Sequence, residues 1–191
     1  HMTVPFASTR RLLDVATAVG CVGIELRNDL SGELFDGQCP EQIALAATAK
    51  GQRILALAEV KAFNENTQDT LDDAAALIAL TSASGAEGIA LIPAVAHQEM
   101  DRADQRAALR VALRALQPLL EKHNQKGLIE PLGFVTSTLR FKEDVVAVLD
   151  EMQRPACFAI LHDTFHHHLA GDDTINADLT ALVHISGVTD P

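Results

Sequence analysis

Three side chains that can bind a metal ion each lie at or near the end of a short apolar run in this sequence. Glu130 follows the apolar residues of LIEPLG, Asp163 ends CFAILHD, and His184 lies inside LVHISGV. Two carboxylates and an imidazole from successive strands form a mixed oxygen and nitrogen donor set. Such a set suits Mn²⁺, Mg²⁺, Co²⁺ or Zn²⁺ better than Ca²⁺, which prefers oxygen ligands alone. The pattern therefore predicts a site for one divalent metal ion.

Each of these residues also has an ordinary structural interpretation. A charged residue at a strand end often faces water, and a lone histidine in a strand is usually a core residue with satisfied hydrogen bonds. A carboxylate buried without a cation is costly, however, so the combination favours a metal site. His166 follows Asp163 closely enough to return to the same site, whereas His167 and His168 are expected at the surface.

Charged residues also end two earlier apolar runs. Glu59 and Lys61, at the end of run 53–60, form either an ion pair or part of a substrate pocket. Glu25 and Arg27, at the end of run 21–27, are similar, and the guanidinium of Arg27 could hold a phosphate or carboxylate of the substrate. Glu59, Lys61 and Arg27 are therefore candidate substrate-binding residues.

The elements that carry these residues alternate along the chain. Almost continuous apolar runs predict strands buried on both faces, and the amphipathic segments between them predict helices. The expected strands are 4–7, 21–27, 53–60, 88–94, 127–133, 157–163 and 182–188. The expected helices begin at Ser8 or Thr9, at Pro40, at Thr67, at Asp101 and at Lys142, and end near Val19, Gly51, Ser84, Lys126 and Met152.

Strands alternating with helices define an α/β protein with a parallel sheet. Polar residues at the ends of several strands favour a closed (β/α)8 TIM barrel over an open sheet, whose ligands gather at one switch point. The chain is shorter than the typical barrel of about 250 residues, and its first expected strand runs directly into a helix cap at Ser8. We therefore expect part of the first βα loop and the eighth strand region to be missing from this sequence. Residues 3–191 then form a single barrel domain, after a tag remnant at residues 1–2.

Composition narrows the partners and the location. The chain has 26 acidic and 15 basic side chains and a formal net charge of −11, which disfavours binding to nucleic acid. Its apolar runs are shorter than the ~18–20 residues that span a bilayer, so no membrane partner is expected. Its three cysteines are widely spaced, and we expect free thiols in a reducing cytoplasm, with Cys21 and Cys157 buried.

The order and spacing of five segments resemble the xylose isomerase-like TIM-barrel superfamily, and within it the sugar-phosphate isomerase/epimerase branch. The segments are VGIELRNDL, ILALAEV, LIEPLGF, LHDTFHHHLAGDD and LVHISGV. That branch includes inosose isomerase and dehydratase, hydroxypyruvate isomerase and ketose epimerases, which are enzymes of carbohydrate metabolism. The resemblance covers nearly the whole chain and is strongest from Gly127 onward.

The resemblance implies a role for each candidate. By position, Glu130, Asp163 and His184 would bind one divalent metal ion, and the fourth ligand, a glutamate on the eighth strand, has no counterpart here. Glu130 would also remove a proton from the substrate, and His166 would contact a substrate oxygen. The implied activity is isomerisation or epimerisation of a small sugar, sugar phosphate or inosose through an enediolate intermediate.

Other functions stay open at this stage. A lyase similar to inosose dehydratase could use the same enediolate, and a metal-free sugar-binding relative needs no chemistry. Activity like that of AP endonucleases is disfavoured by the negative charge and by the few histidines before His162. Thr136 and Asp190 replace a glutamate and an arginine of the ketose 3-epimerases, which argues against that specific activity. The expected partner is a small polyhydroxylated carbonyl compound, and either a monomer or a homodimer or higher homo-oligomer fits.

Overall fold

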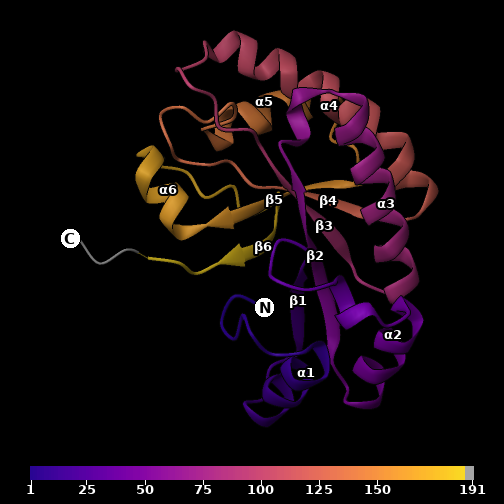
Figure 1. The fold of residues 1–191 in the computed structure, drawn as a ribbon. Helices are drawn as coiled ribbons and strands as arrows, with labels where there is room; N and C mark the ends of the chain where they lie inside the picture. Colours follow the sequence, from indigo (N-terminus) through magenta and orange to yellow (C-terminus); the bar gives the residue numbers. More distant parts are fainter. Residues whose placement is uncertain (188–191) are drawn as a thin grey trace.

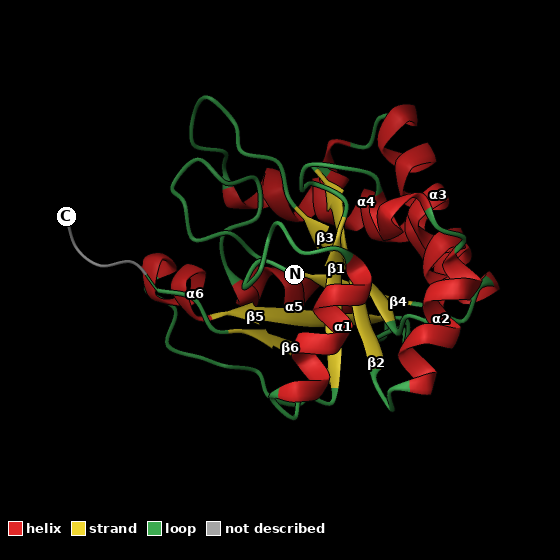
Figure 2. Ribbon diagram, turned by 60° about the horizontal axis from the view of Figure 1, so that its bottom comes forward, coloured by secondary structure: helices red, strands yellow, loops and turns green. Residues whose placement is uncertain are grey.

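The computed structural model of the chain describes residues 1–187 as one curled parallel sheet with helices on its outer face (Figures 1 and 2). The strands are β1 (Gly23–Arg27), β2 (Arg53–Lys61), β3 (Gly88–Ile92), β4 (Lys126–Ile129), β5 (Phe158–Asp163) and β6 (Thr180–His184). The helices are α1 (Thr9–Ala18), α2 (Pro40–Ala49), α3 (Gln68–Ser84), α4 (Arg102–Lys122), α5 (Lys142–Glu151) and α6 (Thr164–Ala170), with short 3₁₀ turns η1 (Leu34–Gly37) and η2 (Phe63–Glu65).

The six strands lie in the sheet in the order of the sequence, and each adjacent pair is parallel. The sheet curls so far that side chains of its two outer strands meet: His184 of β6 and Glu25 of β1 lie 2.8 Å apart. The predicted TIM-barrel-like α/β fold is therefore confirmed, as a half-barrel within residues 1–187.

The helices form where the sequence provides caps and apolar stripes. Ser8 caps α1 by accepting a hydrogen bond from the amide of Arg11, and Thr67 caps α3 in the same way. Gly85 ends α3 in the left-handed conformation that glycine adopts without strain. The expected stripe on α4 is buried against the sheet and consists of Leu109, Leu113, Leu116 and Leu120. None of the helices among residues 1–187 is long and apolar enough to cross a membrane.

Some predicted boundaries were wrong. Residues 4–7 form turns instead of a strand, because their hydrogen bonds are local: Val4 donates to His1, and Ala7 donates to Val4. The predicted strand 127–133 is shorter, since β4 ends at Ile129, and α4 ends before Lys126, which begins β4. The last strand, Thr180–His184, begins two residues earlier than expected and ends four residues earlier. The predicted end of that strand, Val188, lies outside the described residues.

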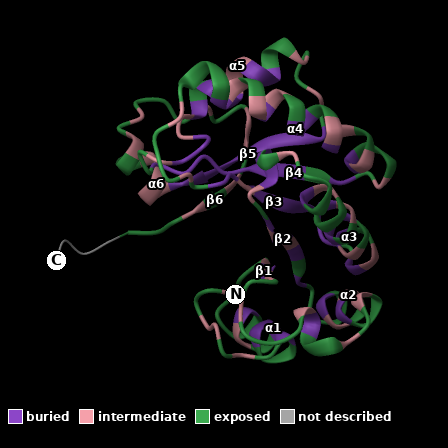
Figure 3. Cartoon of the chain, turned by 45° about the horizontal axis from the view of Figure 1, so that its top comes forward, coloured by how far each residue is buried: buried purple, intermediate pink, exposed green. Residues whose placement is uncertain are grey.

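Buried side chains form two layers on opposite faces of the sheet. Most residues of the central strands β3, β4 and β5 are buried (Figure 3). The larger layer lies between the sheet and the helices and contains most of the buried leucine, isoleucine and phenylalanine side chains. The smaller layer lies on the concave face and consists mainly of small residues: Ala56, Ala58, Ala90, Leu128, Ala159 and Leu161. Small side chains are suited to the concave face, because they leave room above them for polar groups and a cavity.

The three cysteines are free thiols in different environments. Cys157 is buried as predicted, and burial raises the pKa of its thiol to about 11. Cys39 is exposed. The prediction of burial was wrong for Cys21, which is exposed in the turn between α1 and β1.

We expect iodoacetamide at pH 8 to modify Cys21 and Cys39 in the native protein and to leave Cys157 unmodified. The thiolate is the reactive form, and a raised pKa keeps the Cys157 thiol protonated at this pH. Peptide mass spectrometry after alkylation, with and without prior unfolding in urea, measures the difference. Equal labelling of Cys157 and Cys39 in the native protein would contradict the expectation.

Candidate metal centre

The alternation of side chains along the strands places the predicted ligands on the concave face. Leu128 and Leu161 belong to the concave layer, and Leu182 packs against it. Two residues after these leucines come Glu130, Asp163 and His184, respectively. Because residues i and i+2 of a strand point to the same side of a sheet, the three polar side chains share the face of those leucines. The site thus lies at the carboxyl ends of β4, β5 and β6, where TIM barrels carry their active sites.

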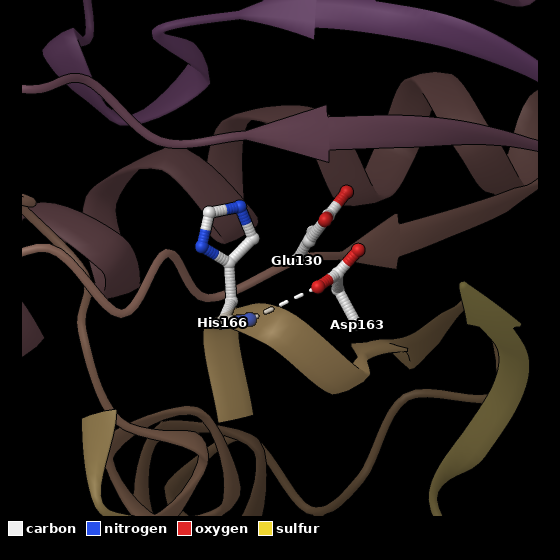
Figure 4. Close-up of side chains that lie close together, drawn as sticks. All are labelled: Glu130, Asp163 and His166. Carbon is white, nitrogen blue, oxygen red and sulfur yellow. Dashed lines mark hydrogen bonds between the residues drawn. The ribbon is translucent and has the colours of Figure 1, made fainter. Parts of the chain in front are cut away.

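Glu130, Asp163 and His166 form the tightest group of potential ligands within residues 1–187 (Figure 4). One ligand atom from each residue lies within 4.8 Å of the other two. Both carboxylates are buried, with 6% of Glu130 and 9% of Asp163 exposed. Asp163 also caps α6, because one of its oxygens accepts a hydrogen bond of 2.9 Å from the amide of His166. Two buried carboxylates and an imidazole that converge in this way fit a divalent metal ion.

His184 lies beside this group, but the carboxylate nearest to it is that of Glu25, not that of a predicted metal ligand. Its Nδ1 is 3.8 Å from an oxygen of Glu130, and its Nε2 is 2.8 Å from an oxygen of Glu25. Burial lowers the pKa of His184, but the carboxylates of Glu130 and Glu25 outweigh that effect and raise it to about 10. The resemblance assigned His166 to the substrate and His184 to the metal, whereas the structure brings His166 to Glu130 and Asp163, and His184 to Glu130 and Glu25.

Ser186 is a polar residue of the site that the sequence did not indicate. Its hydroxyl lies 2.8 and 2.7 Å from the two carboxylate oxygens of Asp163. The only sequence signal is its spacing of two residues from His184, which would place both on one side of an extended segment. Ser186 therefore contributes to holding the Asp163 carboxylate, together with the amide of His166.

These residues line a cavity of about 700 Å³ on the concave side. Its polar lining consists of His1, Thr3, Glu25, Arg27, Glu59, Glu130, Asp163, His166, His184 and Ser186. Two aromatic rings, Phe134 and Phe165, lie edge to face against each other and form part of the same lining. A cavity with convergent polar groups and an aromatic wall has the features of a small-molecule binding site.

The substrate-binding candidates have different positions in the structure. Arg27 and Glu59 line the cavity, but Arg27 is already paired with Asp29 at 2.7 Å and with Glu59 at 3.0 Å. Burial raises the pKa of Glu59, and the charge of Arg27 opposes this shift. Lys61 is exposed and is not part of the cavity wall. The predicted ion pair of Glu59 thus forms with Arg27 instead of Lys61.

His167 and His168, the two histidines that follow His166, differ in burial. His168 is exposed as predicted, but the prediction of a surface position was wrong for His167, which is half-buried. Its Nδ1 contacts the ammonium of Lys142, and its ring lies 4.8 Å from the ring of His162. Lys142 is itself buried and lies 3.4 Å from Asp172, and burial lowers its pKa. This buried cluster fastens α6 to the start of α5.

Comparison with known proteins identifies the class to which this fold and site belong. A family model described as a xylose isomerase-like TIM barrel matches residues 13–190. The chain therefore belongs to the xylose isomerase-like TIM-barrel family, which confirms the resemblance seen in the sequence. No curated protein matches the chain.

Solved structures give the same fold. A xylose isomerase domain-containing protein from Salmonella typhimurium LT2 is 27% identical, with a TM-score of 0.88 over 97% of this chain and 69% of its own. The IolI protein with a bound zinc atom is 18% identical, with a TM-score of 0.77 over 84% of this chain and 59% of its own. The apo form of 3-keto-D-glucoside 4-epimerase from E. coli is 15% identical, with a TM-score of 0.75 over 94% of this chain and 74% of its own.

Proposed function

We propose that this chain carries the active site of a divalent-metal-dependent isomerase or epimerase that acts on a small polyhydroxylated carbonyl compound. The observation that carries the proposal is the convergence of Glu130 and Asp163 with His166 and His184 on one cavity at the carboxyl ends of three strands. The family supports it, as do the zinc atom of the IolI structure and the epimerase activity named for another neighbour.

The residues of the site have complementary chemical roles. A bound divalent ion would polarise the carbonyl oxygen of the substrate and stabilise negative charge on it. The carboxylate of Glu130 accepts the proton from the carbon next to the carbonyl, and the electrons of the broken C–H bond form the enediolate. Return of that proton by Glu130 to the neighbouring carbonyl carbon isomerises the substrate. Epimerisation needs a second proton donor on the opposite face, the role that the resemblance gives to a glutamate of the eighth strand. His166 donates a hydrogen bond to a substrate oxygen.

The charges of the cavity favour an uncharged sugar or inosose over a sugar phosphate. Four carboxylates line it, those of Glu25, Glu59, Glu130 and Asp163. Arg27 is the only lysine or arginine of its described wall, and its guanidinium is already paired with two carboxylates. A phosphate would therefore meet repulsion from these carboxylates that no unpaired lysine or arginine of this wall offsets. We also propose a cytoplasmic location, which suits the three free thiols.

We expect about one Mn, Co, Mg or Zn ion per chain to remain on protein of verified intact mass after mild dialysis. Elemental analysis measures this metal content. The metal-loaded protein is then incubated in D₂O with unphosphorylated ketoses, inososes and the corresponding phosphates. Deuterium that enters the unphosphorylated carbonyl compounds at the carbon next to the carbonyl, followed by mass spectrometry, is the expected sign of proton transfer.

Three other results of these measurements would point to a different function or substrate. Loss of water from the substrate after exchange would identify a lyase similar to inosose dehydratase. Exchange confined to the phosphates would contradict the preference for uncharged substrates. A protein that holds no metal, and takes up none when Mn²⁺ is added, would overturn the enzyme proposal in favour of a metal-free sugar-binding relative.

A further inference from the structure

We propose that Glu25 is a positioning residue for the metal ligand His184. The inference rests on the proposed function, because it concerns how one predicted ligand is presented to the metal. The hydrogen bond between Glu25 Oε2 and His184 Nε2, 2.8 Å long, fixes the imidazole so that its Nδ1 faces Glu130. Nothing in the order of the strands requires this contact, since β1 and β6 lie at opposite ends of the sheet.

The hydrogen bond decides which nitrogen of the imidazole is free to bind a metal ion. The imidazole must release one of its two protons to bind a metal ion, and the nitrogen that loses its proton has the lone pair that the metal requires. A carboxylate at Nε2 keeps the proton there and leaves Nδ1 as the ligand atom. Nδ1 is the nitrogen that lies 3.8 Å from Glu130, on the side of the carboxylate cluster. The tautomer and the direction of the ring therefore both follow from Glu25.

The surroundings make this contact more than an incidental surface pair. Only 15% of the Glu25 side chain and 25% of the His184 side chain are exposed. Glu25 reaches the site through its contact with His184 and is not part of the tight group of Glu130, Asp163 and His166. Within residues 1–187, the ring of His184 makes a single hydrogen bond, to Glu25. Without it the ring would be free to rotate about its bond to Cβ.

We expect Glu25→Met to weaken Mn²⁺ binding by about 10–100-fold, the usual effect of removing the partner that orients a metal-bound histidine. Methionine keeps the volume of glutamate but cannot accept the hydrogen bond. Glu25→Gln retains an acceptor oxygen and is expected to lose less affinity than Glu25→Met. Calorimetric titration of the metal-stripped full chain with Mn²⁺ measures both. Glu87→Ala is the matched control, since Glu87 pairs with Arg53 at the other end of the strands.

A spectroscopic measurement separates positioning from a general effect on the fold. The visible absorption bands of bound Co²⁺ depend on its ligands, and we expect Glu25→Met to change them at saturating Co²⁺ and Glu87→Ala to leave them unchanged. Wild-type affinity in Glu25→Met, or equal losses in Glu25→Met and Glu25→Gln, would overturn the inference. If Glu25→Met fails to fold, Glu25→Asp decides in its place, because it keeps the charge but draws the oxygen away from His184.

His184→Ala separates failure of this inference from failure of the proposed function. Loss of Mn²⁺ affinity in His184→Ala together with wild-type affinity in Glu25→Met would overturn the role of Glu25 and leave His184 as a ligand. Wild-type affinity in His184→Ala would remove His184 from the metal site, and the inference about Glu25 with it. Retained metal binding through Glu130, Asp163 and His166 would then leave the proposed enzyme in place.

Discussion

Substitution of Asp163 by Asn is expected to abolish turnover and to weaken the affinity for Mn²⁺ by more than about tenfold, since even the loss of an outer partner of a ligand costs that much. Asn keeps an oxygen that can accept the hydrogen bond from the amide of His166 and so preserves the cap of α6. It removes the negative charge and replaces one of the two oxygens that face the Ser186 hydroxyl with an amide nitrogen. A loss of metal binding without a loss of folding would therefore assign the charge of Asp163 to the metal.

The measurement is a pair of titrations with Mn²⁺, combined with deuterium exchange into the substrate. Asp173→Asn is the matched control, because Asp173 is an exposed aspartate on the loop after α6. Glu130→Gln is expected to abolish exchange as well, since an amide cannot accept the substrate proton. Exchange at the wild-type rate in either Glu130→Gln or Asp163→Asn would refute the assignment of the site.

Substitution of Gly133 by Ala is expected to destabilise the protein by about 1–3 kcal/mol, the usual cost of overpacking, and to impair the site. A Cβ at residue 133 would lie 2.3 Å from the carbonyl oxygen of His166, 2.8 Å from the amide nitrogen of Ala170 and 2.8 Å from the Cβ of Leu169. Two of these atoms belong to the backbone of α6, so the helix itself would have to move. Because α6 carries His166 and is capped by Asp163, the displacement would reach the metal centre.

Urea denaturation of the metal-free protein measures the free energy of unfolding, and Mn²⁺ titration measures the site. Gly20→Ala is the control, because Gly20 has a φ of +77° but no atom within 4 Å of the added Cβ. It should cost about 1 kcal/mol through its backbone alone and leave metal affinity unchanged. Wild-type stability and metal affinity in Gly133→Ala would mean that α6 does not pack against this glycine as described.

The fold class and two residues of the candidate site could be predicted from local sequence patterns. Apolar runs between capped amphipathic segments predicted six of the strands and five of the helices, because burial on both faces and helical periodicity leave a local signal. Glu130 and Asp163 could be placed for the same reason: each follows a buried strand, and the carboxyl ends of parallel strands meet at one edge. The prediction of a strand at residues 4–7 was wrong, because four residues carry too little pattern to distinguish a strand from turns.

The way in which the side chains pair with one another could not be predicted from local patterns. Glu25 and His184 are 159 residues apart in the chain, and no local pattern indicates that a curled sheet brings their strands together. The same holds for the pairing of Arg27 with Glu59 and for the burial of His167 against Lys142. Periodicity records which face a side chain occupies, but its partners depend on the curvature of the sheet and on the packing of α6. The residue types of the candidate site could therefore be predicted from local sequence patterns, whereas its geometry arises from contacts between distant segments.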